Sequence, residues 1–356
     1  MISKIKILHL LQSGHFSGAE NVACKIIDMF NQDENIEMAY CSKVGQISDV
    51  LNQRGIKFHP MSKLCKTEVR KVIKTFRPDI IHAHDASASV IAASCTSKIP
   101  IVSHLHSNPP WIKKLGLNSL IYLISCMKYK NVLTVSNSIM EEYIFGRYIK
   151  KKTQIIGNPV DLKEIKHKAE KGYDHKYDIT FIGRLSKEKD PLRFINLIYE
   201  IKKSIPNIKV AIVGQGYLES DCKSLINRLE LNDSIDLKGF LSNPYPLLSN
   251  SKILCITSKW EGFGLVAMEA MTLGCPVICT PVGGLPMLVN EYCGSMCEKD
   301  EEFVIELQKL LGDKQVLREK SQGAIKQAYN LENIDIYKQT LDNIYKNIIG
   351  EMSNYA

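Results

Sequence analysis

The sequence predicts an α/β protein of two domains, each built on a parallel sheet that helices cover on both faces. Short apolar runs alternate with helical segments along the whole chain, which is typical of such sheets. The chain has 356 residues, 45% of them apolar, which is too long for one ordinary core and suits two. Polar residues gather near the middle of the chain, where a boundary between two domains is expected.

Eight apolar runs are predicted strands, four on each side of this polar stretch. In chain order they are Lys6–Leu11, Ile80–Ala83, Ile101–His104, Val132–Val135, Ile179–Ile182, Lys209–Val213, Ile253–Ile256 and Pro276–Cys279. The lysine-rich stretch Lys163–Tyr177 is the predicted linker. The expected domains are residues 1–165 and 166–335, and a final helix at about 335–356 is expected to pack back on the first. Ligand is expected between the two halves, where strand ends face each other.

The eleven cysteines indicate a reducing compartment. Their number is odd, they form no CxxC pair, and the apolar run Ile5–Leu11 is too short for a signal peptide, so a cytoplasmic location is expected. Cys293 and Cys297 could ligate a metal, but no His or Cys pair lies near them in sequence, which favours ordinary thiols. No stretch is long enough to span a bilayer, the nearest being Leu115–Met127.

The positive charge of the chain lies in its first domain. Residues 1–165 carry 22 Lys and Arg against 13 Asp and Glu, a net +9, whereas the remaining residues have a net −1. A basic face there can meet an anionic membrane surface or simply keep the protein in solution. Nucleic acid is not an expected partner, because the sequence shows neither interleaved aromatic and basic residues nor a recognised nucleic-acid module.

The segment Trp111–Lys130 combines an apolar middle with lysines at both ends. Such a segment fits a helix that lies in the interface of a membrane. It equally fits a helix that faces the core and has solvated ends. The lysines are Lys113, Lys114, Lys128 and Lys130, and the apolar residues between them are Leu115, Leu117, Leu120, Ile121, Leu123, Ile124 and Met127.

The span EGFGLVAME places Glu261 and Glu269 eight residues apart, around a Gly-Phe-Gly turn that opens a predicted helix. At a helical rise of about 1.5 Å per residue, the two carboxylates stand roughly 12 Å apart and hold two ends of one ligand. The free backbone N–H groups between them, at the helix start, form a phosphate site. This indicates sugar at Glu261, phosphates at the helix start and ribose at Glu269. The alternative is an ordinary helix start with two solvated acids.

Six further pieces accompany this span in a fixed order. They are SGHFSGAEN at 13–21, TVSNSI at 134–139, IIGNPVD at 155–161, FIGRLSKEKD at 181–190, AIVGQG at 211–216 and PVGGLP at 281–286. With the two spaced glutamates, the sequence resembles the retaining nucleotide-sugar glycosyltransferases of the GT-B fold, of the group 1 (family 4) type. The resemblance covers nearly the whole chain. It implies an α/β architecture of two Rossmann-like domains that face each other across a cleft.

The resemblance also implies roles for residues of the second domain. Arg184 and Lys189 would hold the donor diphosphate and stabilise the leaving nucleotide as the glycosidic bond breaks. Glu261 would hold the transferred sugar together with the backbone near Phe263 and Gly264. Glu269 would accept from the ribose hydroxyls, and the segment at Gly239 and Phe240 would present backbone to the nucleobase. The alternative for Arg184 and Lys189 is a pair of solvated surface cations.

In the first domain, the resemblance points to Gly18 for the donor phosphates or acceptor and to His106 for an acceptor contact. The runs HAHD (82–85) and HLH (104–106) put imidazoles on one strand face at a period of two. Three interpretations stay open: a four-histidine metal site, structural hydrogen bonding, and an acceptor-contacting His106. Ser136, at a strand end, either faces the cleft or caps the next helix.

The expected function is transfer of a hexose from a nucleotide diphosphate sugar to an acceptor hydroxyl with retention of configuration, in bacterial surface polysaccharide or glycolipid assembly. The resemblance implies a UDP-sugar in preference to a GDP-sugar, a glycan or lipid-linked acceptor, no cofactor and no metal. Work at the inner face of the plasma membrane is also expected. A hydrolysing nucleotide-sugar 2-epimerase and a non-catalytic GT-B partner subunit are the rivals. Two departures from the family pattern are Met287, where an acid is usual, and Pro159 in an NPVD turn.

Overall fold

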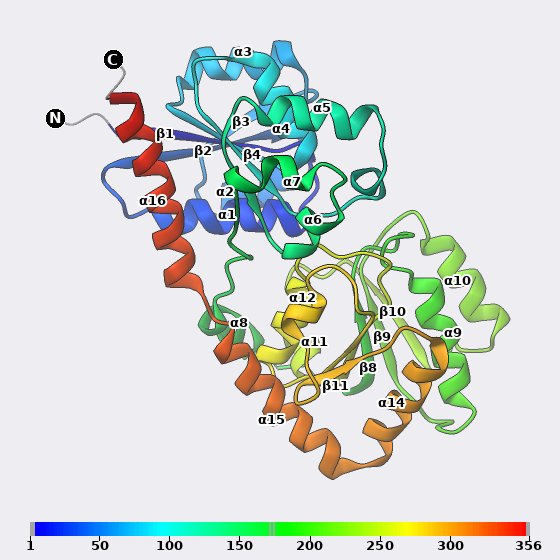
Figure 1. Ribbon diagram of the computed structural model, residues 1–356. Helices are drawn as coiled ribbons and strands as arrows, with labels where there is room; N and C mark the ends of the chain where they lie inside the picture. The colour runs from blue at the N-terminus through cyan, green and yellow to red at the C-terminus, as the bar shows by residue number, and fades with distance from the viewer. Residues whose placement is uncertain (1–3, 171, 174, 354–356) are drawn as a thin grey trace. The chain divides into compact units, whose positions relative to one another are not determined.

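The structure, a computed structural model, describes residues 4–170, 172–173 and 175–353. It divides into two compact units. The first comprises the chain up to Pro159 together with the residues from Asn333 onward, and the second comprises Val160–Glu332. Each unit contains one parallel α/β sheet (Figure 1).

The first unit is built on a seven-stranded sheet in the order β3-β2-β1-β4-β5-β6-β7, with every neighbouring pair parallel. Its strands are β1 Ile5–Leu10, β2 Ile36–Lys43, β3 Phe58–Met61, β4 Ile80–His84, β5 Ile101–Leu105, β6 Tyr129–Thr134 and β7 Thr153–Ile155. Its helices are α1 Gly18–Phe30, α2 Ile47–Gln53, α3 Lys66–Phe76, α4 Asp85–Cys95, α5 Leu117–Cys126, α6 Asn137–Glu142, α7 Gly146–Ile149 and α16 Ile334–Ser353, with short 3-10 turns η1 Pro110–Lys113 and η2 Lys150–Lys152.

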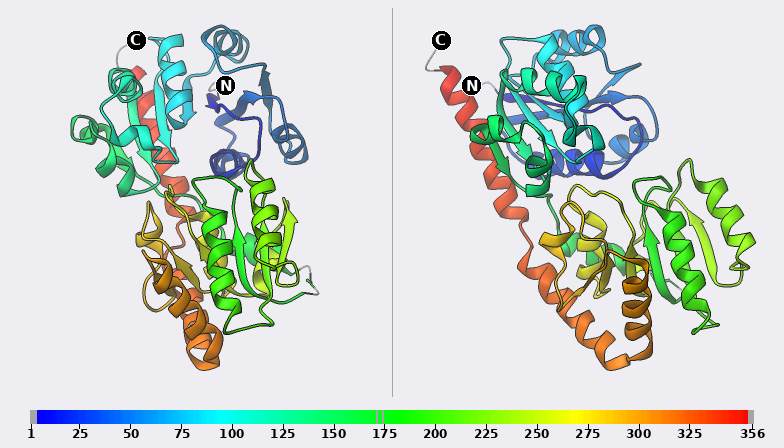
Figure 2. Two further views of the ribbon diagram at one scale, coloured as in Figure 1. Left: turned by 90° about the vertical axis from the view of Figure 1, so that its right-hand side faces the viewer. Right: turned by 45° about the vertical axis from the view of Figure 1, so that its right-hand side comes forward.

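Helices cover both faces of this sheet, with α1 on one face and α3 to α5 on the other (Figure 1; Figure 2). On the α4–α5 side, the Ser103 hydroxyl of β5 bonds to Ser89 at 2.7 Å and to Tyr122 at 2.9 Å. On the α1 side, Tyr345 of the C-terminal helix α16 packs edge-on against Phe30. The strand order reverses between β1 and β4, so the ends of these two strands are where an α/β sheet binds ligands.

The second unit is built on a six-stranded parallel sheet in the order β10-β9-β8-β11-β12-β13. Its strands are β8 Tyr177–Ile182, β9 Val210–Val213, β10 Ile235–Gly239, β11 Ser251–Ile256, β12 Val277–Cys279 and β13 Gly294–Met296. Its helices are α8 Leu162–Ala169, α9 Pro191–Lys202, α10 Glu219–Arg228, α11 Tyr245–Ser249, α12 Leu265–Thr272, α13 Leu285–Leu288, α14 Asp300–Gly312 and α15 Lys314–Asn330.

Alternate residues of β11 enter two separate cores of this unit. Ile253 and Cys255 belong to a cluster with α9, α10 and α14, whereas Leu254 and Ile256 belong to a cluster with α8, α12 and α15. The period of two therefore buries both faces of the strand. Cys297 lies in the first cluster and Cys293 in the second, so these thiols do not share a site.

The stretch expected to be a linker is largely structured, which corrects that prediction. Its first part forms most of α8, whose residues Leu162 and Ile165 are buried in the second unit. Its last residue, Tyr177, begins β8. The units therefore divide after Pro159 rather than after residue 165, because the apolar side of α8 packs on the second unit. Two residues of the stretch, 171 and 174, lie outside the described residues.

The segment Trp111–Lys130 is not one helix, so the expected single interfacial helix is wrong in extent. Its first residues belong to the 3-10 turn η1, and α5 covers only Leu117–Cys126. Gly116 begins α5 from an extended conformation, and the chain already enters β6 at Tyr129. Among the described residues, the helices are all too short or too polar to cross a bilayer.

Candidate functional site

The candidate site of the second unit lies where its strand order reverses, between β8 and β11. Lys189 stands in the turn after β8 and Glu261 in the loop after β11, and these loops leave neighbouring strands at the same edge. Lys189 Nζ donates to Glu261 Oε1 at 2.5 Å, and the two side chains are 27% and 11% exposed. The ion pair is therefore mostly shielded from solvent.

Further contacts hold these two loops together. The Ser258 hydroxyl donates to the same Glu261 Oε1 at 2.8 Å. The Thr257 hydroxyl lies within hydrogen-bond distance of the carbonyls of Lys189, at 3.2 Å, and Asp190, at 3.0 Å. The backbone N–H of Lys259 donates to Glu188 O at 2.8 Å, and its ammonium pairs with Asp190 at 3.0 Å. The sequence analysis did not identify Ser258 as a site residue. The one sequence feature that could have indicated it is its position three residues before Glu261.

A third loop packs directly on Glu261 through glycine. A Cβ on Gly283 would lie 1.8 Å from the carbonyl oxygen of Glu261, and Gly283 has a φ of +60°. A Cβ on Gly284 would lie 2.6 Å from the carbonyl oxygen of Phe263. Only glycine allows these backbones to approach so closely. The PVGGLP loop thereby fixes the position of the Glu261–Phe263 backbone.

Helix α12 begins at this point without a side-chain cap. Its N-cap is Gly264, with a φ of +98° and no side-chain cap hydrogen bond. A Cβ on Gly264 would lie 2.7 Å from Leu285, so this position also requires glycine. Gly264 has no side chain to cap the first turn, and a helix start of this kind suits an anion.

The other expected site residues of this unit lie on the same edge at separate positions. Arg184 follows β8, is 55% exposed and lies 3.7 Å from Glu188. Phe240 follows β10 and is 42% exposed. Glu269 is part-buried on α12 and accepts from the Tyr245 hydroxyl at 3.0 Å. Tyr245, in a stretch without a motif, gave no signal in the sequence.

The AIVGQG glycines bring the end of β9 onto the loop that carries Arg184. A Cβ on Gly214, which has a φ of +137°, would lie 1.9 Å from the carbonyl oxygen of Gly183. The N–H of Gly214 donates to Gly239 O at 2.7 Å. These contacts join the ends of β8, β9 and β10, so Arg184 and Phe240 leave one connected edge of the sheet.

In the first unit, His106 follows β5 and is anchored at both backbone and ring. Its backbone N–H donates to Asp85 Oδ1 at 2.9 Å, and its Nε2 lies 2.8 Å from Nδ1 of His84. Burial lowers the pKa of His106 to about 3, so its ring is neutral at physiological pH. Burial also raises the pKa of Asp85, the residue with a φ of +65° at the start of α4, to about 6.

The histidines of HAHD and HLH form one array with His9, which sequence reasoning missed. Their rings are hydrogen-bonded to one another in the interior of the unit. Two sets, His9 with His82 and His84, and His84 with His104 and His106, also have ring nitrogens within 4.8 Å of one another. The spacing of the ring nitrogens therefore suits a metal ion. The same nitrogens lie at hydrogen-bond distance from one another, which suits structural hydrogen bonding.

Two further expected residues of the first unit are placed less tightly. Gly18 is the first residue of α1, and a Cβ there would meet no atom within 4 Å, so the space beside it is open. The close approach in that loop occurs instead at Gly14, whose Cβ would lie 2.5 Å from Val44 O. Ser136 takes the N-cap position of α6, but its hydroxyl pairs with that of Ser138 at 2.8 Å.

Comparison with known proteins covers most of the chain. The model of glycosyl transferases group 1 matches residues 163–331, and that of glycosyltransferase family 4 matches residues 33–164. A UDP-Gal:alpha-D-GlcNAc-diphosphoundecaprenol alpha-1,3-galactosyltransferase of Escherichia coli is 25% identical over 88% of this chain and 89% of its own length.

Two more similarities agree with these matches. An N-acetylgalactosamine-N,N'-diacetylbacillosaminyl-diphospho-undecaprenol 4-alpha-N-acetylgalactosaminyltransferase of Campylobacter jejuni is 31% identical over 53% of each chain. The crystal structure of HepE of Anabaena, in complex with UDP and glucose, aligns at a TM-score of 0.84 and 21% identity, over 96% of this chain and 100% of that one. The chain therefore belongs to the glycosyltransferases of the GT-B fold, with a family 4 domain followed by a group 1 domain.

Proposed function

We propose that this protein transfers a hexose from a UDP-sugar to an acceptor hydroxyl and retains the anomeric configuration. The observation that carries the proposal is the shielded Lys189–Glu261 pair beside the uncapped start of α12. The cation and the helix start match the leaving diphosphate of such a donor, and the acid matches the hydroxyls of its sugar.

In the proposed reaction, the second unit stabilises the leaving nucleotide. The ammonium of Lys189 and the guanidinium of Arg184 face the charge that develops on the diphosphate, and the N–H groups of α12 add to them. Glu261 accepts hydrogen bonds from hydroxyls of the transferred sugar, and Glu269 accepts from the ribose. These positive groups supply the charge that a divalent ion would bring, so the transfer is proposed to need no metal.

Retention follows in this proposal from attack on the face that the leaving group departs from. An oxygen of the departing phosphate takes the proton of the acceptor hydroxyl as the new glycosidic bond forms. No protein nucleophile is required. The alternative of a non-catalytic partner subunit is disfavoured, because such a subunit has no need of a shielded Lys–Glu pair at the switch point.

The proposed acceptor is lipid-linked, in the assembly of a bacterial surface glycan. Two relatives are named for acceptors carried on undecaprenol diphosphate. A lipid-linked acceptor requires the enzyme to work at a membrane surface, which we place on the α3–α5 side of the first unit. There α5 exposes Leu117, which is 73% exposed, and Ile124, which is 64% exposed, and Met127, directly after the helix, is 80% exposed.

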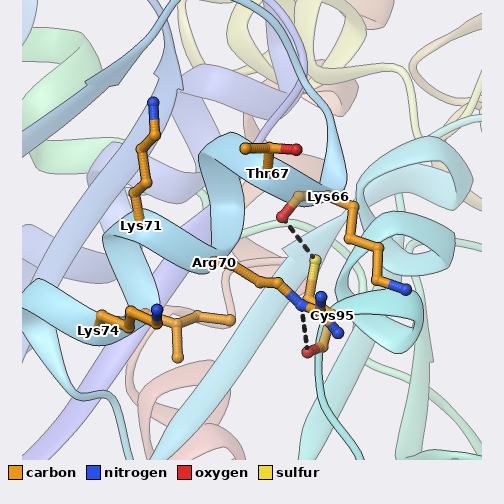
Figure 3. Close-up of a pocket in the computed structure, with 7 residues that line it drawn as sticks. Lys66, Thr67, Arg70, Lys71, Lys74 and Cys95 are labelled. Atoms are coloured by element: carbon orange, nitrogen blue, oxygen red, sulfur yellow. Dashed lines mark hydrogen bonds between the residues drawn. The ribbon is translucent and has the colours of Figure 1, made fainter.

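Basic side chains lie in the same helical layer, on α3. A cavity of about 540 Å³ lies beside α3, and Arg70 Nε donates to Cys95 O at 3.3 Å at its edge. Figure 3 shows the side chains that line it. Helix α4 packs against both α3 and α5. Apolar residues of α5 would enter the interface while the cations meet anionic headgroups, a combination typical of peripheral binding. The cations at the cavity are Lys66, Arg70, Lys71 and Lys74.

A donor panel tests the proposal against its rivals. The protein is incubated with a lipid-linked acceptor and with UDP- and GDP-sugars that thermal shift identifies as ligands, and the products are analysed by mass spectrometry. Nucleotide release with a new glycoside supports the transferase. Release with a free 2-epimeric sugar indicates the hydrolysing epimerase, and binding without release from any donor indicates a non-catalytic subunit.

A further inference from the structure

Glu261 accepts two hydrogen bonds through its side chain, and both end on the same oxygen. Lys189 Nζ donates to Oε1 at 2.5 Å, and the Ser258 hydroxyl donates to it at 2.8 Å. No side chain or backbone N–H of the described residues donates to Oε2. A mostly shielded carboxylate favours donors on both oxygens, because burial removes the water that would otherwise supply them. Oε2 is therefore the oxygen that can accept from a ligand.

The two donors on Oε1 differ in how far they can move. Lys189 carries its ammonium on a flexible four-carbon chain and is partly exposed, so it can turn away from Glu261 toward a phosphate. Ser258 is buried, and a single side-chain torsion places its hydroxyl oxygen. Its carbonyl accepts from the Thr280 hydroxyl at 2.6 Å, which anchors its backbone to the end of β12. Ser258 therefore stays in place when Lys189 turns away.

The backbone of Glu261 is fixed, but its carboxylate is not fixed by the backbone. The close approach of Gly283 holds the Glu261 carbonyl, whereas the last side-chain torsion of a glutamate has a broad range. Once Lys189 has turned to a phosphate, the hydrogen bond from Ser258 is the contact among the described residues that still limits this torsion. Without that bond, either oxygen of Glu261 could face the ligand.

We infer that Ser258 is a positioning residue that decides which oxygen of Glu261 meets the donor sugar. It keeps Oε1 when Lys189 turns to the diphosphate, and Oε2 then accepts from a hydroxyl of the hexose. The substrate class is a nucleotide sugar whose hexose carries a hydroxyl at the position that faces Oε2. Such a site rejects the matching deoxy sugar, because Oε2 would then be shielded without a donor. The role of Ser258 rests on the proposed function, which places sugar at Glu261.

Binding of the nucleotide with and without its sugar separates this role from a merely structural one. Calorimetry gives Kd for UDP and for whichever of UDP-glucose, UDP-galactose and their N-acetylamino forms binds most tightly. Ser258→Ala should weaken binding of the UDP-sugar about tenfold, the value of one hydrogen bond to a charged group. It should leave Kd for UDP within about twofold of wild type, because UDP has no sugar for Glu261. Equal changes for the two ligands, or no change for either, would overturn the inference.

Two further variants control for the loss of a buried hydroxyl. Ser258→Thr keeps the hydroxyl and should recover most of the affinity for the UDP-sugar. Ser251→Ala removes another buried hydroxyl, which bonds to Thr180 at 2.6 Å and donates to Leu247 O at 2.9 Å at the start of β11, away from the site. It should leave both Kd values unchanged. A folded Ser258→Thr that binds no better than Ser258→Ala, or an equal loss in Ser251→Ala, would contradict the role of Ser258.

Monodeoxy analogues of the same UDP-sugar test the contact at Oε2 from the side of the ligand. In wild type, one analogue should bind at least about tenfold more weakly than the parent, because it lacks the hydroxyl that Oε2 accepts from. For that analogue, Ser258→Ala should weaken binding by less than about threefold, because the contact that Ser258 positions is already absent. Losses that simply multiply would show that Ser258 does not act through this contact.

The two proposals fail in different ways. If Ser258→Ala weakens binding of the UDP-sugar alone but no acceptor is glycosylated, the proposed transferase fails and the role of Ser258 stands. If transfer is observed but Ser258→Ala affects UDP and the UDP-sugar equally, the role of Ser258 fails and the transferase stands. Absence of binding to every UDP-sugar would refute both. Unfolding midpoints in urea, measured for each variant, show whether it retains the fold.

Discussion

Lys189 Nζ donates to Glu261 Oε1 at 2.5 Å, although the two residues are 72 positions apart in the chain. The pairing of β8 with β11 brings them together. Each side chain neutralises the other where a donor diphosphate and sugar are proposed to bind. Donor binding would therefore redirect the ammonium toward phosphate and the carboxylate toward sugar hydroxyls.

Removing Lys189, Arg184 or Glu269 is expected to abolish most transfer. Lys189→Ala should lower kcat by about 10²–10³, because it removes a charge aimed at the leaving group. Arg184→Ala and Glu269→Ala are also expected to remove most activity while the fold remains intact. Steady-state kinetics measure the effect, and Lys187→Ala, an exposed lysine of the same turn, is the control. Turnover close to wild type in all three variants would refute the donor site.

Gly283→Ala should destabilise the second unit and reduce activity together. The new Cβ would stand 1.8 Å from Glu261 O at a φ of +60°, so the loop must shift and carry Glu261 with it. A strained position of this kind costs about 1–3 kcal/mol before any clash is counted. Urea unfolding followed by kinetics measures both effects. Gly312→Ala is the matched control, because its Cβ meets no atom within 4 Å, and equal effects in the two variants would contradict the account.

The eight predicted strands are all present, because buried parallel strands show continuous apolar runs. The strands that were not predicted, β2, β3, β7, β10 and β13, are flanking or edge strands in which polar residues interrupt the run. Thus β3 includes Pro60 and β7 consists of Thr153–Ile155. The boundary after residue 165 was misplaced because α8 is lysine-rich, and only its packing shows the buried side.

The motifs identified Lys189 and Glu261 separately, but their ion pair depends on strand order, which no local pattern contains. Ser258 and Tyr245 contact the candidate site residues Glu261 and Glu269 from positions outside the motifs. His9 lies in the run KILHLL of the first predicted strand, and it joins the histidine array only because β1 pairs with β4 in the register observed. Long-range register is the information that a single sequence lacks.

Membrane association is expected to depend on α5. Replacing Ile124, which is 64% exposed, by Asp should reduce flotation with vesicles that contain anionic lipid, because a charge would enter the apolar face of α5. Ile305→Asp, at a 61% exposed position of the second unit, is the matched control. Two outcomes would show that α5 is an ordinary surface helix. The first is that the wild-type protein does not bind the vesicles, and the second is that neither salt nor Ile124→Asp reduces its binding.

Asp85→Asn should stabilise the first unit at neutral pH. Burial raises the pKa of this carboxyl to about 6 from 3.8, so the folded state retains a proton that the unfolded state has lost. The contribution of Asp85 to the free energy of unfolding therefore falls as the pH rises from about 4 to 6, and it stays at this lower value above pH 6. Asn keeps the acceptor for His106 N–H and tolerates the φ of +65° without carrying the charge.

The gain from Asp85→Asn should thus be about 1 kcal/mol at pH 4.5 and reach about 3 kcal/mol at pH 7.5. Free energies of unfolding from urea titrations at both values measure it. A variant that is less stable than wild type at pH 7.5, or a difference that shrinks as pH rises, would contradict the assignment of a buried, unfavourable carboxylate.

Chelation is expected to leave transfer nearly unchanged, because Lys189, Arg184 and the start of α12 carry the positive charge at the diphosphate. The assay uses protein dialysed against a chelator, with metal content measured by elemental analysis. Loss of activity that Mn²⁺, Mg²⁺ or Zn²⁺ restores would instead assign a divalent ion to the phosphates or to the histidine array.

The anomeric configuration of the product tests the central claim most directly. The enzyme is supplied with a lipid-linked acceptor and with an α-linked UDP-hexose from which it releases UDP. The configuration of the new linkage is determined from the ¹H NMR signal of the anomeric proton. The account predicts an α-glycoside formed in equal amount to the UDP released. A β-glycoside, or UDP release accompanied only by free sugar, would contradict it.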